Sequence, residues 1–180
     1  MNTKKFLYFT FFVFAFMTFI PAQANAEISI AVVDIHKILS ESKAAKSVKA
    51  QVKSKREGFV KEVKSAEDAL RKDQKKLEEA KDKVSKEELM KQFRSFEKKR
   101  LDARKKLQEK QKGLDQAYNK AMADLSKSIF GVCQKIADEG KIDLVITKDN
   151  IIVGNKALDI TAEVLENLNK ILPKLALDIK

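Results

Sequence analysis

The chain has 180 residues, of which 35% are charged, and it carries a formal net charge of +11. A single cysteine excludes an internal disulfide framework. Because the chain has only one histidine and one cysteine, a typical metalloenzyme site is disfavoured. No nucleophile–base pair, phosphate-binding loop or zinc-ligand spacing occurs in the sequence, so we predict neither an enzyme nor a cofactor.

Residues 1–26 have the features of a secretory signal peptide. Two lysines precede an uncharged run over residues 6–20, which is too short to span a bilayer comfortably. An Ala-Asn-Ala sequence then predicts cleavage between Ala26 and Glu27. The alternative is an uncleaved membrane anchor. Cleavage predicts a soluble protein in the bacterial periplasm or cell exterior, where we expect no ATP.

The mature chain opens with a predicted buried strand over residues 28–33, because five of these six residues are Ile, Val or Ala. Asp34 follows at the N-cap position of a short helix, and we favour this role over acid–base chemistry. His36 is interpreted as structural. Cys133, later in the chain among apolar helix positions, is expected to be a buried small residue rather than a redox or intersubunit thiol.

The positive charge is concentrated in one helical segment. Residues 46–112 contain 24 Lys and Arg against 13 Asp and Glu, whereas the rest of the mature chain has 11 against 13. Good helix formers dominate the segment, and interlocked seven-residue apolar series predict a narrow coiled-coil seam. The series are Val52, Phe59, Ala66 and Ala80 with Val63, Leu70, Leu77 and Val84, and then Phe93, Leu107, Leu114 and Ala121 with Leu89, Phe96, Ala103 and Ala117; Arg100 and Lys110 interrupt the last two.

A turn is predicted near residue 85. Ser85 and Glu88 have the spacing of a capping box, which starts a new helix. Folding about this turn pairs residues whose numbers sum to roughly 170 and aligns the two apolar seams. This register favours an antiparallel hairpin over the alternative, a single long dimeric coiled coil. At about 1.5 Å per residue, a helix of about 40 residues is about 60 Å long, so the hairpin must project as an arm.

Gly58 and Gly113 lie at about the same height on the two sides of this arm. Each glycine lowers helix stability by up to about 1 kcal/mol relative to alanine. We interpret the pair as a hinge that lets the arm bend, with chance or local close packing as the alternative.

The remaining residues predict a small body. Gly140 ends the returning helix, strands are predicted at 142–146 and 151–153, and Asp159 or Thr161 can cap a last helix. Three short strands leave open edges and bury little area, which indicates an oligomer that shares its sheet between subunits. The predicted division is a body of residues 27–45 and 118–180 with an arm of residues 46–117.

Four motifs stand in order around the charged hairpin: IAVVD at 30–34, KILSES at 37–42, IDLV at 142–145 and DITAEVL at 159–165. Together they resemble the Skp/OmpH family of periplasmic chaperones over nearly all of residues 27–170. The resemblance implies an α+β fold, in which a small β-rich oligomerisation body forms a shared β-barrel in a homotrimer. Each subunit then extends a long antiparallel α-helical coiled-coil hairpin arm.

The function implied by this resemblance is that of an ATP-independent holdase, which binds unfolded outer-membrane proteins in a cavity between the arms and prevents their aggregation. Positive arms would attract acidic clients, and many weak contacts would hold them without a deep pocket. Phe93 and Phe96 are expected in the seam, with one of them reaching a client near the tip. The alternative is an exported structural or adaptor coiled coil of the cell envelope. A nucleic-acid binder is disfavoured by export and by the lack of basic aromatic patches.

Two further features are the densest basic group of the arm and the C-terminal residues 172–180. The resemblance implies lipopolysaccharide binding by arm Lys and Arg residues without identifying them, and we treat the densest basic group as a site for lipopolysaccharide or anionic lipid; a solvated helix face is the alternative. This group is Lys98, Lys99, Arg100, Arg104, Lys105 and Lys106. The chain also continues past the family's usual end over residues 172–180, and the simplest interpretation of this segment is a frayed tail.

Overall fold

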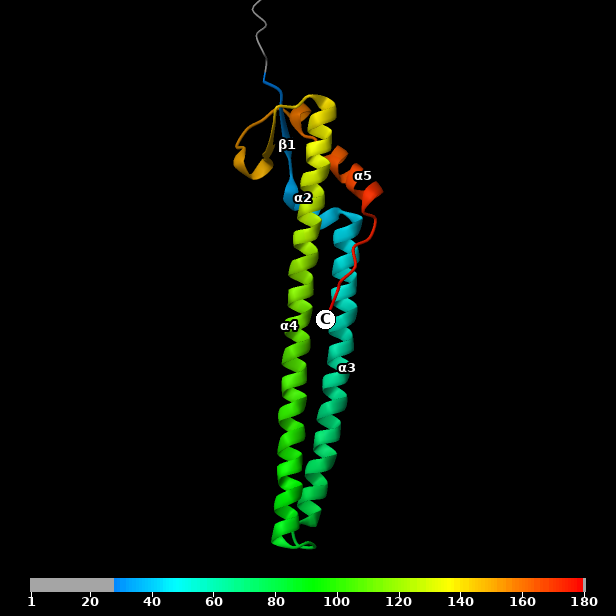
Figure 1. Ribbon diagram of the computed structural model, residues 1–180, viewed down its shortest axis with the longest axis vertical. Coiled ribbons are helices and arrows are strands. Elements are labelled where there is room, and N and C mark those ends of the chain that lie inside the picture. The colour runs from blue at the N-terminus through cyan, green and yellow to red at the C-terminus, as the bar shows by residue number, and fades with distance from the viewer. Residues whose placement is uncertain (1–27, 180) are drawn as a thin grey trace, which may run out of the picture.

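The computed structural model describes residues 28–179, so the predicted signal peptide and its cleavage site lie outside the described residues. Two long helices lie side by side, and the other elements gather around one end of the longer one (Figure 1). The elements in chain order are β1 (Ile30–Val33), α2 (Ile35–Glu41), α3 (Lys43–Ala80), α4 (Lys86–Gly140), β2 (Leu144–Thr147), the short 3-10 helices η1 (Lys148–Asn150) and η2 (Lys156–Leu158), and α5 (Thr161–Ile171).

The helices α3 and α4 form the predicted hairpin, with 38 and 55 residues respectively. The Ser85 hydroxyl accepts a hydrogen bond from the Glu88 backbone N–H at 3.2 Å, which confirms the predicted start of α4. The Glu88 carboxylate does not complete the predicted box in this geometry, because it accepts from the Gln92 side chain one turn further on.

The register of the hairpin is close to that predicted from the apolar series. Asp73 pairs with Lys99 at 2.7 Å, and Glu62 pairs with Lys110, so both pairs have residue numbers that sum to 172. Asp73 occupies the missing position of the first outgoing series, and Lys110 interrupts a returning one. Two of the three breaks in the apolar pattern are therefore occupied by charges that pair across the seam. Arg100, at the third break, instead pairs with Glu97 on its own helix at 2.7 Å.

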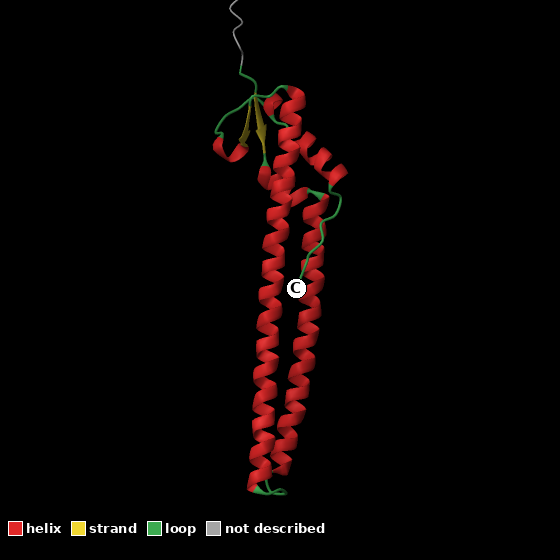
Figure 2. Ribbon diagram, viewed as in Figure 1, coloured by secondary structure: helices red, strands yellow, loops and turns green. Residues whose placement is uncertain are grey.

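Strands β1 and β2 pair in parallel, with Ile30 opposite Leu144 and Val33 opposite Thr147 (Figure 2). They are parallel because the chain between them leaves along α3 and returns along α4. The free edge of β1 receives the segment that leads into α5, since the Ile160 backbone N–H donates to the Val32 carbonyl at 2.9 Å.

The predicted third strand at residues 151–153 is wrong for this chain. Within residues 28–179, β2 has β1 as its one strand neighbour, but the backbone turns through η1 after β2 and does not return along the other edge of β2. The free edge of β1 is occupied by residues 159–160. Ile152 and Val153 are consequently 101% and 89% exposed. A segment with β propensity forms a strand only where the chain runs alongside a neighbouring edge.

The core lies where the body end of α4 meets α2, α5 and the start of α3. Ile38, Leu125, Ile129 and Leu168 are fully buried there. Full burial of a side chain of this size contributes about 1.5–3 kcal/mol. Cys133 belongs to the same cluster, which confirms the predicted buried position, and burial raises the pKa of its thiol.

Helix α4 ends at Gly140 as predicted, but the left-handed residue that terminates it is Lys141, with φ of 52°. Gly140 has a different use. A Cβ at this position would lie 3.3 Å from the Ile142 side chain, so the glycine lets Ile142 fold back against the helix end. Ile142 in turn packs against the core just before β2 begins.

Candidate functional site

The arm lacks a closed core over most of its length. Between residues 49 and 113, all of which the structure describes, no residue is buried. Two helices in contact cover only a narrow stripe on each other, so the apolar seam residues of this segment remain partly exposed on their flanks. The arm therefore presents apolar surface to the solvent in a position where a partner can reach it.

A large open groove lies near the tip of the hairpin and has a volume of about 930 Å³. Met90 and Phe93 stand at its edge and are 54% and 51% exposed. Phe93 therefore lies at the outer edge of the seam and lines the same groove as Leu77, whereas Phe96 is half-buried within the seam. The apolar residues lining this groove are Leu70, Leu77, Leu89, Met90, Phe93 and Phe96.

Two more grooves, of about 470 and 650 Å³, continue from the tip towards the body. Glu67 lines all three grooves, and Phe59, Val63 and Leu107 line both of the latter two. The shared lining residues make the three hollows one interrupted strip along the hairpin. We call this strip the arm groove.

The predicted anion-binding group is divided by the structure. Arg100, Arg104 and Lys106 line the arm groove. Lys99 instead pairs with Asp73 outside the arm groove.

The other members of the predicted group have different surroundings. Lys105 lies 3.9 Å from Glu109 along its own helix, and Lys98 is exposed on α4. The six residues therefore do not form one site, and half of them contribute positive charge to the edge of an apolar groove.

The charge pairs across the arm lower the pKa values of their acidic members. The hydrogen bond from Lys99 is the largest cause for Asp73, and the hydrogen bond from Lys110 is the largest cause for Glu62. Lys110 also lies over the Phe59 ring, with its ammonium 5.6 Å from the ring centroid. These contacts favour the register that leaves the arm groove open on its flank.

The two predicted hinge glycines lie inside uninterrupted helices. A Cβ built on Gly58 would meet nothing within 4 Å, so close packing does not require glycine at this position. Gly113 is half-buried in α4, directly before Leu114, the first buried residue on the way back to the body. Among the described glycines none has a positive φ, so backbone conformation does not explain either residue.

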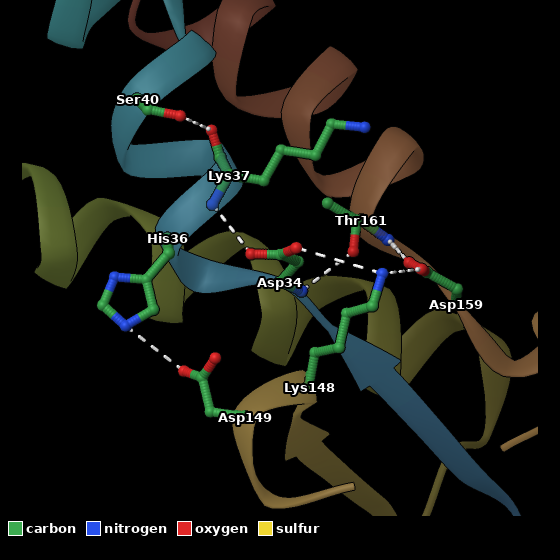
Figure 3. Close-up of polar contacts among 8 residues, drawn as sticks. All are labelled: Asp34, His36, Lys37, Ser40, Lys148, Asp149, Asp159 and Thr161. Carbon is green, nitrogen blue, oxygen red and sulfur yellow. Dashed lines mark hydrogen bonds and ion pairs between the residues drawn. The ribbon is translucent and has the colours of Figure 1, made fainter. Parts of the chain in front are cut away.

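A polar network holds the body together where β1, η1 and α5 meet (Figure 3). Asp34 caps α2 by accepting from the Lys37 backbone N–H at 2.8 Å, which confirms its predicted role. The backbone N–H of Asp34 donates to the Thr161 hydroxyl, and the Thr161 N–H donates to Asp159. Lys148 lies 3.6 Å from Asp159 and 3.9 Å from Asp34.

Each member of this network has a partner within the body, which assigns it a structural role. The hydrogen bonds from the Thr161 hydroxyl and backbone, followed by the charge of Lys148, lower the pKa of Asp159. His36 faces Asp149 at 3.3 Å on the exposed side of the network. The sequence carried no signal for this last pair, because more than a hundred residues separate its members.

Sequence reasoning also missed Gln51 and the order of the C-terminal segment. The Gln51 side-chain amide donates to the Leu175 carbonyl at 2.7 Å, and its oxygen accepts from the Leu177 backbone N–H at 3.0 Å. Leu172 and Leu175 pack against the core cluster. The interpretation of residues 172–180 as a frayed tail is therefore wrong over residues 172–179.

The sequence matches the family of OmpH-like outer membrane proteins over residues 29–168. The protein belongs to the OmpH-like family. A crystal structure of a Caulobacter crescentus protein, assigned to the OmpH-like outer membrane chaperones, resembles the chain with a TM-score of 0.78. The two share 21% sequence identity over 86% of this chain and 92% of that one, a level at which the similarity shows the fold alone.

The family match confirms the resemblance inferred from the four sequence motifs. A search among curated proteins found no match. Within residues 28–179, no helix has the length and apolar character needed to cross a membrane.

Proposed function

We propose that this OmpH-like protein is an ATP-independent holdase chaperone, which binds unfolded outer-membrane proteins in the periplasm and prevents their aggregation. The arm groove is the observation that carries the proposal. It is an open apolar strip edged by arginine and lysine, on a part of the arm, residues 49–113, that has no buried residue. Membership of the OmpH-like family and the fold shared with the Caulobacter chaperone support the same class of function.

The groove suits a ligand with exposed apolar side chains and no fixed shape. Covering about 100 Å² of apolar surface contributes about 2.5 kcal/mol, but ordering a flexible chain opposes this gain. Contacts at Met90, Phe93 and Leu107 are therefore individually weak, and a client is retained by using several at once. The stems of Arg100 and Arg104 can cover apolar client segments while their charged ends remain in water.

The net charge of +11 over residues 46–112 supports long-range attraction of acidic clients. We propose that Arg100, Arg104 and Lys106 form the part of the predicted basic group that meets anionic partners, including the head groups of lipopolysaccharide or anionic lipid. The alternative for these residues remains a solvated helix face. Neutralising all three without loss of binding to anionic vesicles would favour that alternative.

We further propose that the protein acts as a homotrimer with a shared β-barrel body, formed by residues 27–45 and 118–180, and three arms formed by residues 46–117 around the client cavity. Each strand of the β1–β2 pair has only 4 residues, too few for an independently stable sheet. Exposed apolar residues gather on the same body, including Ile30, Leu144, Ile152 and Val153. Export, followed by cleavage after Ala26, is proposed to bring the protein to the periplasm.

The test is refolding of a denatured β-barrel protein by dilution, with light scattering as the readout and a mass measurement of the complex. Suppression of scattering without ATP, at one trimer per client, is expected. Met90→Ser with Phe93→Ser should weaken suppression, whereas Leu101→Ser should not, because Leu101 is 60% exposed on α4 but lines none of the three grooves. Absence of suppression by the unaltered chain would favour a structural adaptor instead.

A further inference from the structure

The C-terminal segment leaves the body and runs along α3 towards the arm. Helix α5 ends at Ile171, and Pro173 disfavours helical geometry at the residue before it, so the chain becomes extended. Figure 1 shows this segment following α3 and ending beside the part of that helix that is nearer the body. We call residues 172–179 the tail.

One side chain of α3 binds the tail through its backbone. In an extended segment, the carbonyl of one residue and the N–H of the second residue after it point to the same side. The Gln51 amide satisfies this pair, with its Nε2 on the Leu175 carbonyl and its Oε1 on the Leu177 N–H. Nε2 also contacts the Ser47 hydroxyl at 3.2 Å, which orients the amide towards the tail.

The side chains of the tail alternate in the manner of a β-strand with one apolar face. Leu175, Leu177 and Ile179 are half-buried, whereas Ala176 and Asp178 are exposed. The same alternation, apolar on one face and polar on the other, characterises the strands of membrane β-barrels. Gln51 binds backbone atoms, and every second side chain of the tail is only partly buried. Such a site selects alternating apolar residues without selecting a particular sequence.

The tail packs less deeply than the helix that precedes it. None of residues 172–179 is buried, although Val164 and Leu168 of the preceding helix are fully buried. A segment that only closed the core would be expected to bury its leucines as α5 does. The tail instead occupies the body end of the arm through two directional hydrogen bonds and half-buried side chains.

We propose that Gln51 and the surface around it form a binding site for extended chain segments with alternating apolar residues, and that the tail occupies this site until a client segment displaces it. The inference rests on the proposed chaperone function, since it identifies the segment of client that is recognised. It adds a site at the root of the arm, separate from the groove at the tip, that reads the strand-like pattern of the client backbone.

The test uses a labelled peptide with the sequence of residues 172–180 and a second alternating peptide of unrelated sequence, with fluorescence anisotropy as the readout. Both should bind a chain lacking residues 173–180 at least tenfold more tightly than the full chain, because the attached tail competes at high effective concentration. The full-length variant L175D/L177D releases the tail without shortening the chain and should bind both peptides as the truncated chain does. Circular dichroism verifies that each variant is folded.

Two matched controls test the geometry. In the truncated chain, Gln51→Leu should weaken peptide binding about tenfold, whereas Gln108→Leu, at an exposed position on α4, should have no effect. A peptide with an N-methyl group at Leu177 loses the N–H that Gln51 accepts and should bind about tenfold more weakly. N-methylation at Ala176, whose N–H points to the other side of an extended segment, should be tolerated.

Equal peptide binding by the full and truncated chains would overturn the proposal. Binding of the tail peptide without binding of the unrelated alternating peptide would also overturn it, because the tail would then be a specific strap. Either result leaves the scattering assay of the full chain unaffected. Failure of that assay with every variant would instead reject the chaperone function while the peptide measurements remain informative about the site.

Discussion

Gly58 is the arm residue whose substitution has the clearest expected effect on helix stability and on bending of the arm. It lies in the interior of α3 with helical backbone, and a Cβ there would meet nothing within 4 Å. Gly58→Ala should therefore stabilise the helix by up to about 1 kcal/mol without steric cost, which corresponds to about a fivefold change in the unfolding equilibrium. The midpoint temperature of thermal unfolding should rise by about 2–4 °C for a chain of this size.

Gly131 supplies a matched control for this prediction. It also lies inside a helix, at the body end of α4, and a Cβ there also meets nothing within 4 Å. Gly131→Ala should raise stability by a similar amount but leave the bending of the arm unchanged. The comparison separates the general effect of glycine on helix stability from a local effect on the arm.

The assay for bending is the distribution of distances between spin labels at the arm tip and on the body. Gly58→Ala combined with Gly113→Ala should narrow this distribution if the pair forms a hinge, and Gly131→Ala should not. If the substitutions stabilise the protein without narrowing the distance distribution, the hinge is rejected and the two glycines lie at the same height by chance. A loss of stability in Gly58→Ala would refute the steric reasoning itself.

Four other predictions follow from the same structure. Raising the salt concentration from 0.01 to 0.15 M shortens the Debye length from about 30 to about 8 Å, so the rate of client capture in stopped-flow fluorescence should fall; a salt-independent rate would contradict steering by the arms. The pKa of Asp73 is held below its ordinary value of 3.8 by Lys99, and that of Glu62 below 4.5 by Lys110. The stability from these pairs is therefore complete above the ordinary pKa values and is lost as the pH falls through the lowered ones, so distances across the arm should broaden below about pH 4 but not between pH 6 and 8. Leu125→Ala should destabilise the body by about 2–5 kcal/mol in urea unfolding, because Leu125 is fully buried. Cys133 should react slowly with a thiol reagent in the native state and rapidly in denaturant, since burial raises its pKa.

Several elements could be predicted because their causes are local or periodic. The Ser85 cap depends on contacts within one turn of helix, and the apolar series repeat every seven residues regardless of the rest of the fold. The family also followed from short motifs in a fixed order. The placement of Asp34 as a helix cap belongs to the same group, since its partner Lys37 is only three residues away.

Other features depend on residues that are distant in the sequence and could not be predicted in this way. Phe93 and Phe96 have the same side chain, and each belongs to a seven-residue apolar series. The packing of α3 against α4 nevertheless leaves Phe93 at the groove edge and covers Phe96. The sequence correctly located the densest cluster of basic residues. Its division between the arm groove and the pair with Asp73 follows from the curvature of the helix surface, which separates neighbours in sequence.

The sequence by itself determined the hairpin, its turn and its register, because helix propensity, capping and seven-residue periodicity act over short distances. Only the tertiary structure decided the fate of residues 151–153 and of the tail. Strand formation needs a neighbouring edge beside the segment. Residues 159–160 occupy the edge that β1 offers, and the turn at residues 148–150 leads the chain away from β2. Order in the tail needs a partner for its backbone, and that partner, Gln51, lies more than a hundred residues earlier in the chain.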